Sequence, residues 1–248
     1  MVKKIIKDKN MPKLKPSVAC IGYFDGVHLG HQELIKKTID EAIRLNLTAT
    51  LICFEPDPVE VITGEKKKHL LSMDNRLNLI EYSGIEQVIV IKFTDSFMKL
   101  SPKEFINEYL NKMNIKELIC GFDFKFGYKG KGNAGTLSRN SKFKTIVIPE
   151  YKYYGKKISS TRIIYSFING KFSLTNKLLG YDYCLELIVV DCISKRSKYI
   201  VKTKLKDSNC ILPKHGKYGN KFEIKDGYIY ITGNSKLNKN QLMILSFN

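Results

Sequence analysis

The sequence predicts an α/β protein, in which a Rossmann-like domain with a parallel sheet precedes a small all-β, barrel-like domain. Up to residue 180, short apolar runs alternate with segments whose apolar residues recur at helical spacing, as in a parallel sheet with helical crossovers. Beyond residue 182, short runs of β-branched and aromatic residues are separated by turn signals such as Asp226-Gly227. We therefore predict two domains, residues 1–182 and residues 183–248.

The net charge of +18 arises from 42 lysines and arginines against 24 acidic residues. An excess of this size is compatible with nucleic acid, an acidic membrane or small anions as partners. Only five of the basic residues are arginine, the side chain favoured for bidentate contacts with phosphates and bases. We therefore interpret the charge mainly as a lysine-rich solvated surface and do not expect nucleic acid as a partner.

The six cysteines form no Cys-x-x-Cys pair and show no metal-ligand spacing. Cys20, Cys53 and Cys120 fall inside apolar runs, where a free thiol behaves as a small buried hydrophobic group. No apolar run approaches membrane-spanning length. These features predict a cytoplasmic protein with no membrane partner.

Residues 18–31 place two histidines at a junction between a strand and a helix. The apolar run at 18–21 predicts a buried strand, two glycines permit a tight turn, and a helical pattern follows. Free backbone N–H groups and the positive end of a helix dipole favour phosphate there. His28 and His31 are three residues apart, so both can face that phosphate. The stretch therefore predicts a nucleotide site.

The other elements of the first domain follow in order. Strands are predicted at residues 47–54, 87–91, 117–120 and 145–148, and helices near Asp74 and after Ser101. Ser101-Pro102-Lys103-Glu104 combines an N-cap serine, a proline at the first helical position and a capping-box glutamate. Two prolines end the strand at 47–54, and residues 62–69 lack periodicity, which predicts a mobile loop.

Residues 121–135 follow the fourth strand and are rich in glycine, lysine and aromatic residues. Because ligands gather at the carboxyl ends of parallel strands, we expect a flexible flap beside a planar, charged ligand. The alternative is a glycine-rich surface hairpin, which would leave phenylalanines exposed without a partner.

A second anion site is predicted at Ser159-Ser160-Thr161-Arg162, where a helical pattern begins. Hydroxyl groups can cap this helix while the guanidinium binds phosphate oxygens. A short helix at residues 174–179 ends at Gly180. The five strands predicted beyond it, at residues 185–190, 199–203, 222–224, 228–231 and 242–247, indicate a barrel or curled sheet.

In this order, the motifs resemble those of the FAD synthetase (FMN adenylyltransferase) family. Residues 22–31, Gly-Tyr-Phe-Asp-Gly-Val-His-Leu-Gly-His, resemble its nucleotide-binding signature, and residues 158–162, Ile-Ser-Ser-Thr-Arg, its closing signature. Further matches are residues 54–58, 70–72 with Arg76 and Gly84, 93–97, 100–105, 121–127 and 178–180.

The resemblance implies transfer of AMP from Mg-ATP to the phosphate of FMN, with FAD and pyrophosphate as products. It implies His28, His31 and Arg162 as catalytic residues. The implied ATP-binding residues are Gly22, Phe24, Asp25, Gly26, His28, Gly30, His31, Ser159, Ser160, Thr161 and Arg162. The implied flavin-binding residues are Phe54, Pro56, Asp123, Phe124 and Phe126, with Phe24 as a further aromatic candidate. Mg²⁺ would be held mainly through phosphates, so no metal ligand is assigned.

Two positions depart from the family pattern. Asp57 stands where a histidine is usual between two prolines, and Ile164 stands where a second basic residue usually follows Ser-Ser-Thr-Arg. The riboflavin kinase signature Gly-Phe-Pro-Thr-Ala-Asn is also missing after Gly180. We therefore expect no kinase activity and interpret residues 183–248 as a reduced or degenerate β domain.

Two other functions remain open at this point. One is another His-x-Gly-His nucleotidyltransferase, such as a cytidylyltransferase acting on a phosphorylated alcohol. The other is a basic RNA-binding module that uses the C-terminal domain and the lysine excess. The aromatic segment at residues 121–127 favours a flavin over a small polyol.

Overall fold

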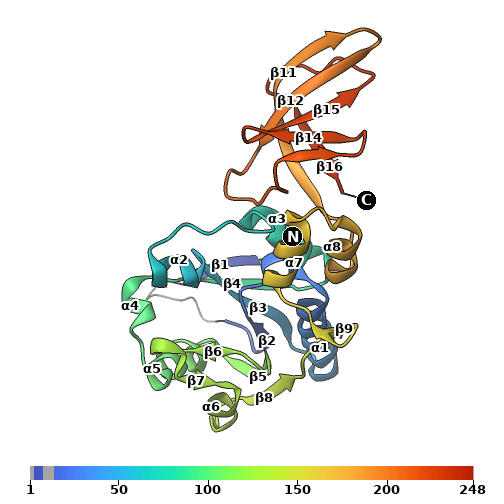
Figure 1. The fold of residues 1–248 in the computed structure, drawn as a ribbon. Helices are drawn as coiled ribbons and strands as arrows, with labels where there is room; N and C mark the ends of the chain where they lie inside the picture. The colour runs from blue at the N-terminus through green and yellow to red at the C-terminus, as the bar shows by residue number, and fades with distance from the viewer. Residues whose placement is uncertain (1–2, 8–13, 248) are drawn as a thin grey trace. The chain divides into compact units, whose positions relative to one another are not determined.

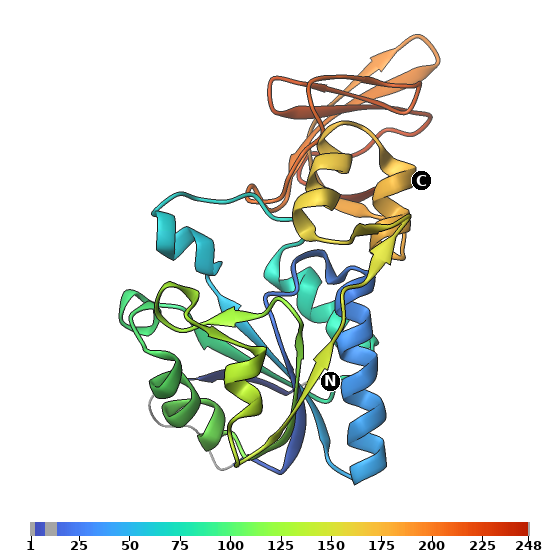
Figure 2. The same ribbon diagram turned by 60° about the horizontal axis from the view of Figure 1, so that its bottom comes forward.

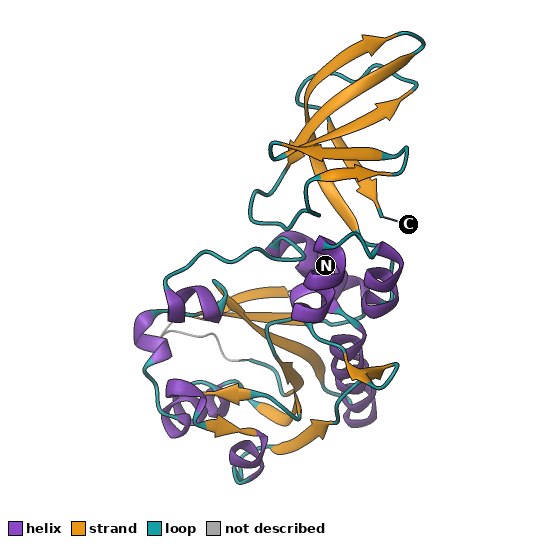
Figure 3. Cartoon of the chain, in the orientation of Figure 1, coloured by secondary structure: helices purple, strands orange, loops and turns teal. Residues whose placement is uncertain are grey.

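The computed structural model describes residues 3–7 and 14–247. The chain divides into a first unit, Met1–Lys67 with Met73–Lys157, and a second unit, Lys68–Ser72 with Ile158–Asn248. Figure 3 shows helices alternating with strands in the first unit, and two helices followed by strands in the second. Both parts of the predicted fold class are confirmed.

The first unit is built on a six-stranded sheet in the order β1–β4–β3–β2–β5–β8, with every neighbouring pair parallel (Figure 1). Its strands are β1 (Lys3–Lys7), β2 (Ser17–Ile21), β3 (Thr48–Glu55), β4 (Gln87–Lys92), β5 (Ile115–Gly121) and β8 (Lys144–Ile148). The predicted strands are all present. The edge strand β1 was not predicted, because its sequence is too short and too rich in lysine to give a strand pattern.

Helices cover both faces of this sheet, which is why the central strands are continuous apolar runs. Helix α1 (Leu29–Leu45) packs along β2, β3 and β5, as Figure 2 shows. On the other side, the core joins strand residues such as Ile52 and Leu118 to Phe105 and Leu137 from helices. The strands therefore form a rigid base whose carboxyl ends can carry a site.

The chain reverses its direction across the sheet next to β2. From β2 it moves outward to β3 and β4 on one side, and it then returns to β5 on the other side of β2. Such a topological switch point leaves a crevice at the carboxyl ends of the strands, where open α/β sheets bind ligands. The turn that follows β2 contains the first histidine of the predicted nucleotide site.

Short helices connect the remaining strands. They are α2 (Pro58–Thr63), α3 (Met73–Tyr82), α4 (Asp95–Met98), α5 (Pro102–Glu108) and α6 (Ala134–Ser138), with the 3₁₀ turns η1 (Asp25–Val27), η2 (Leu110–Lys112) and η3 (Tyr128–Gly130). The capping box predicted for Ser101 and Glu104 is present at α5. Helix α2 was not predicted, because we interpreted the two prolines only as the end of the preceding strand. Asp57, which lies between them, is the N-cap of this helix.

The segment at residues 121–135, which we predicted to form a flap, contains a short antiparallel hairpin. Strands β6 (Lys125–Phe126) and β7 (Gly132–Asn133) pair antiparallel, and the Phe126 ring is buried in the core. A Cβ atom added at Gly132 would lie 2.7 Å from this ring. Long-range packing, which local composition does not reveal, therefore fixes the hairpin.

The second unit contains one antiparallel sheet in the order β13–β14–β15–β12–β11–β16. Its elements are α7 (Ser160–Ile168), α8 (Phe172–Leu179), β11 (Cys184–Lys195), β12 (Lys198–Leu205), β13 (Gly216–Tyr218), β14 (Phe222–Lys225), β15 (Tyr228–Gly233) and β16 (Leu242–Ser246). Phe167 of α7 packs against Tyr183 and Phe247, with ring centroids 4.7 and 4.9 Å away. This aromatic core joins both helices to the sheet, so the unit begins at Ile158, ahead of the predicted division.

Residues Lys68–Ser72 belong to the second unit although they lie between α2 and α3 of the first. His69 forms a β-bridge with Cys210, and the buried Tyr183 hydroxyl donates to the Leu70 carbonyl oxygen. Our prediction of a mobile loop over residues 62–69 is therefore wrong at both ends, since Ile62 lies in α2 and His69 is paired.

The cysteines and the helices bear on two further predictions from the sequence. All six cysteines are free, and Cys20, Cys53 and Cys120 are buried as predicted. Within residues 3–7 and 14–247, no helix is both long and apolar enough to cross a membrane.

Candidate active site

The turn after β2 holds an unusual backbone conformation. Phe24 has φ of 60° and Val27 has φ of 38°, although side chains disfavour this left-handed region, and Gly26 has φ of 74°. Strain of this kind persists only where surrounding contacts enforce it, and it concentrates at functional sites. The turn leads directly into His28.

His28 is the N-cap of α1. Its Nδ1 accepts a hydrogen bond from the His31 backbone N–H at 3.3 Å. A nitrogen that accepts carries no proton, so a neutral His28 must carry its proton on Nε2. The cap therefore fixes the tautomer and leaves Nε2–H as a hydrogen-bond donor at the start of the helix.

His31 lies one helical turn further on and stacks on His28, with ring centroids 3.7 Å and ring planes 12° apart. The Phe24 ring lies behind His31, at a centroid distance of 5.0 Å. The His31 Nδ1 atom is buried and has no hydrogen-bond partner among the described residues. The pair predicted at this junction is thus brought together as a packed unit.

Both imidazoles are held in the neutral form. Burial, assisted by the nearby charge of Lys157, lowers the pKa of His28 to about 4, although a hydrogen bond with its own backbone and the charge of Asp123 oppose the shift. Burial also holds the pKa of His31 well below its usual range, assisted by His28 and Arg76. At neutral pH the pair therefore offers hydrogen-bond donors but no positive charge.

Gly30 allows the chain to approach His28 closely. A Cβ atom on Gly30 would lie 3.3 Å from two atoms of the His28 ring and 3.7 Å from the Tyr151 Cβ. A larger residue would therefore press on the His28 imidazole. Gly22, also predicted to bind ATP, donates its backbone N–H to the Ile52 carbonyl oxygen at 3.1 Å.

The predicted flavin-binding aromatics lie mostly in the core. Phe54 packs edge-on against Phe93, Phe126 packs against Phe105, and both are only 7% exposed. Phe24 is wholly buried, so in this arrangement its ring has no surface that a flavin could touch. Phe124, which stacks on Phe126, keeps a partly exposed face. Pro56 follows a cis peptide bond at the end of β3.

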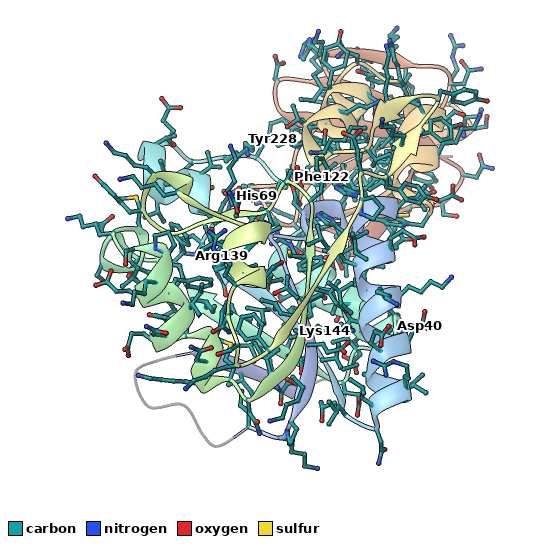
Figure 4. All side chains as sticks on the ribbon, turned by 90° about the horizontal axis from the view of Figure 1, so that it is seen from below. Asp40, His69, Phe122, Arg139, Lys144 and Tyr228 are labelled. Atoms are coloured by element: carbon teal, nitrogen blue, oxygen red, sulfur yellow. The ribbon has the colours of Figure 1, made fainter. Side chains whose placement is uncertain are left out.

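Asp123, the predicted polar contact, forms an ion pair with Lys157. Lys157 also lies over the ring of Phe122, 5.1 Å from its centroid. Asp123 follows closely after β5, which ends at Gly121, so the ion pair lies near the carboxyl end of this strand. Figure 4 labels the neighbouring Phe122 and, at the amino end of β8, Lys144. Sequence reasoning missed Lys157, because nothing local distinguishes it from the many other lysines.

The remaining predicted residues belong to the second unit. Ser159 is the N-cap of α7, and its Oγ accepts the Arg162 backbone N–H at 3.3 Å. Ser160, Thr161 and Arg162 form the first turn of this helix. The predicted cap is therefore present, and the phosphate contacts stay a prediction.

No metal cage was predicted, and the described part of the chain contains no group of three or more His, Cys, Asp or Glu side chains that could hold an ion. A metal held by substrate phosphates and water needs no such group.

A parallel sheet, a switch-point turn and a helix capped by the first of two stacked histidines define the class of protein, a nucleotidyltransferase. The chain belongs to the FAD synthetase family, whose sequence profile matches residues 10–162. The family predicted from the motifs is therefore confirmed.

Curated relatives support this membership along most of the chain. The bifunctional riboflavin kinase/FMN adenylyltransferase of Bacillus subtilis is 36% identical over 222 residues, which are 86% of this chain and 69% of that protein. The protein of the same name from Buchnera aphidicola (subsp. Schizaphis graminum) is 38% identical over 183 residues, 71% of this chain and 59% of its own length.

A solved structure shares the fold. The crystal structure of a macrolide-efflux protein from Streptococcus pneumoniae matches with a TM-score of 0.84 and 23% identity, covering 100% of this chain and 90% of that one. At this identity the likeness concerns the fold alone.

Proposed function

We propose that the chain transfers the adenylyl group of ATP to the phosphate of FMN, releasing pyrophosphate and forming FAD. The observation that carries this proposal is the capped, stacked pair of His28 and His31 at the switch point of the sheet. Family membership and the names of the curated relatives support the same reaction.

The reaction needs no covalent enzyme intermediate. A phosphate oxygen of FMN attacks the α-phosphorus of ATP, and the bond to the pyrophosphate oxygen breaks. Catalysis then depends on holding the two phosphates in line and on stabilising the charge that develops on their oxygens.

His28 supplies a donor for this charge. Because its Nδ1 is engaged by the backbone of α1, its Nε2–H donates to a phosphoryl oxygen as a neutral group. The free backbone N–H groups and the dipole at the start of α1 assist. Because the imidazoles are neutral, cations must neutralise the negative charge of the phosphates. We assign this role to Lys157 on the flavin side and to Arg162 at the start of α7.

Ser159, Ser160, Thr161 and Arg162 hold the β- and γ-phosphates of ATP in this proposal. The support is local: α7 begins with a capping hydroxyl and carries a guanidinium in its first turn, a combination suited to anions. In this proposal the flavin contacts Phe124 and Asp123 of the segment at residues 121–135, together with Lys157, the ion-pair partner of Asp123.

Mg²⁺ accompanies ATP in this proposal. With no cage of three ligands among the described residues, the ion would be carried by phosphates and water, which suits its preference for keeping several waters. When bound it would neutralise phosphate charge, and every residue role above stands independently of it.

We further propose that the chain is cytoplasmic and lacks riboflavin kinase activity. None of the six cysteines forms a disulfide, which supports a reducing compartment. The missing Gly-Phe-Pro-Thr-Ala-Asn sequence supports the lack of kinase activity.

A two-arm assay tests the proposal. The purified chain is incubated with Mg²⁺, ATP and FMN, or with riboflavin in place of FMN, and FAD is followed by chromatography. We expect FAD from FMN only. FAD from riboflavin would contradict the absence of kinase activity, and no FAD in either arm would contradict adenylyl transfer. The alternatives are tested by replacing ATP with CTP and a phosphorylated alcohol, and by measuring RNA binding.

A further inference from the structure

Arg76 is a buried cation in one of the matched motifs, and the proposed reaction assigns it no role. It lies on α3 and is 2% exposed. Burying a guanidinium costs several kcal/mol unless paired groups compensate. The groups that contact Arg76 therefore indicate the role of this buried charge.

Three contacts of Arg76 fall on one short stretch of the turn after β2. One terminal nitrogen donates to the Tyr23 carbonyl oxygen at 3.0 Å, and the other lies 3.7 Å from the Asp25 Oδ1. The guanidinium carbon lies 4.3 Å from the centroid of the Tyr23 ring. Asp25 is itself only 4% exposed, so this is a buried ion pair.

These contacts bracket Phe24, the first residue of the turn with a left-handed backbone. Val27 follows at φ of 38°, a rare conformation for a β-branched residue. Such conformations are energetically unfavourable and need support from their surroundings. Arg76 therefore contacts the Tyr23 carbonyl oxygen on one side of Phe24 and the Asp25 carboxylate on the other.

The geometry of the histidines depends on the same turn. Phe24 packs against His31, and His28 follows Val27 directly as the N-cap of α1. If the turn adopted another backbone conformation, the contact of Phe24 with His31 and the position of His28 Nε2 would change together. The strained turn therefore links Arg76 to the reacting phosphates without direct contact.

We propose that Arg76 is a positioning residue, which locks the turn at Tyr23–Asp25 and thereby sets His28 and His31 for adenylyl transfer. This inference rests on the proposed function. Lysine is a poor substitute, because one ammonium cannot bond the carbonyl and the carboxylate while also stacking on the Tyr23 ring.

The test compares Arg76→Met and Arg76→Lys with wild type in the FMN assay, with Arg196→Met as a control for loss of an exposed arginine. We expect kcat to fall at least about tenfold in Arg76→Met and by less in Arg76→Lys, with KM for FMN changed less than about threefold, since the lost interaction acts on the transition state. Arg196→Met should match wild type. Circular dichroism and thermal unfolding establish that each variant is folded.

A folded Arg76→Met with wild-type kcat would overturn the inference, as would an equal rise of KM for both substrates at unchanged kcat. If Arg76→Met does not fold, Asp25→Asn tests the same ion pair, and unchanged kcat there has the same meaning. In the combined variant the two losses should not add, because they remove one interaction. Absence of FAD with wild-type protein would instead refute the proposed function itself.

Discussion

The imidazole rings of His28 and His31 are stacked 3.7 Å apart, and the backbone N–H of the second residue is bound by the side chain of the first. The stack and the cap are two aspects of one arrangement, since α1 must begin at His28 for the two rings to share a face. It also requires neutral rings, because two protonated imidazoles at this distance would repel each other.

Replacement of His28 by asparagine should separate its two roles. The Asn Oδ1 can accept the His31 N–H as Nδ1 does, so the helix cap and the stability should be retained. The side chain cannot place a donor where His28 Nε2 lies. We therefore expect kcat to fall by at least about tenfold with little change in melting temperature, from the size of lost transition-state contacts.

His28→Ala provides the matched comparison, because it removes both the donor and the cap. It should show a similar loss of turnover and also lose about 1 kcal/mol of unfolding free energy. Wild-type turnover in His28→Asn would rule out a donor role for His28.

Stability should decrease as the pH falls below neutral. The pKa of His28 is lowered, mainly by burial, to about 4, whereas in the unfolded chain the imidazole takes up its proton near its usual pKa of 6.5. The unfolded state therefore binds more protons between these values, and acid favours it. Each such histidine should remove about 1.4 kcal/mol per pH unit within this window, with His31 shifted in the same direction.

Urea unfolding at several pH values between 7.5 and 4.5 measures this loss. Since carboxylates titrate at the lower end, the informative quantity is the difference between wild type and His28→Asn. The variant should lose stability less steeply with falling pH. Parallel curves for the two proteins would mean that His28 is not held neutral by the fold.

Local signals allowed much of the fold to be predicted. The capping box at Ser101 and Glu104 and the left-handed Gly180 after α8 depend on neighbouring residues, and both are present. The features that were not predicted depend on distant contacts. Phe126 of the hairpin is buried in the core, and packing of Phe167 on Phe247 joins α7 to the second unit.

The candidate site was predicted only where it depends on residues that lie close together in the sequence. The histidine pair and the Ser159 cap follow from short spacings, whereas Lys157 meets Asp123 only through the fold, 34 residues away in the chain. Aromatic side chains were the least predictable, because a flavin platform and a core contact have the same sequence signal. Phe54 and Phe24 are core residues.

Asp57 should contribute to stability as a helix cap. Its Oδ1 accepts the Val59 backbone N–H at 2.7 Å, while its Oδ2 lies 4.0 Å from Lys67 Nζ. Asp57→Ala removes the cap and should cost about 1–2 kcal/mol in the free energy of unfolding measured with urea. Asp57→Asn keeps an acceptor and should cost less, whereas equal losses would show that the charge matters more than the cap.

Gly127 should be the least replaceable position of the hairpin. Its φ of 70° and ψ of 174° are accessible almost only to glycine. A Cβ atom there would also lie 2.8 Å from the Pro102 backbone nitrogen. Strain and overlap with a neighbouring backbone should together cost Gly127→Ala roughly 3 kcal/mol or more.

Gly130→Ala separates these two causes. Gly130 has φ of 64°, but the nearest atom to an added Cβ is 3.6 Å away, so only the backbone strain of about 1 kcal/mol applies. Urea unfolding of both variants gives the comparison, and KM for FMN shows whether the hairpin reaches the substrate. A flexible flap would tolerate both changes equally, whereas a hairpin fixed against α5 tolerates only the second.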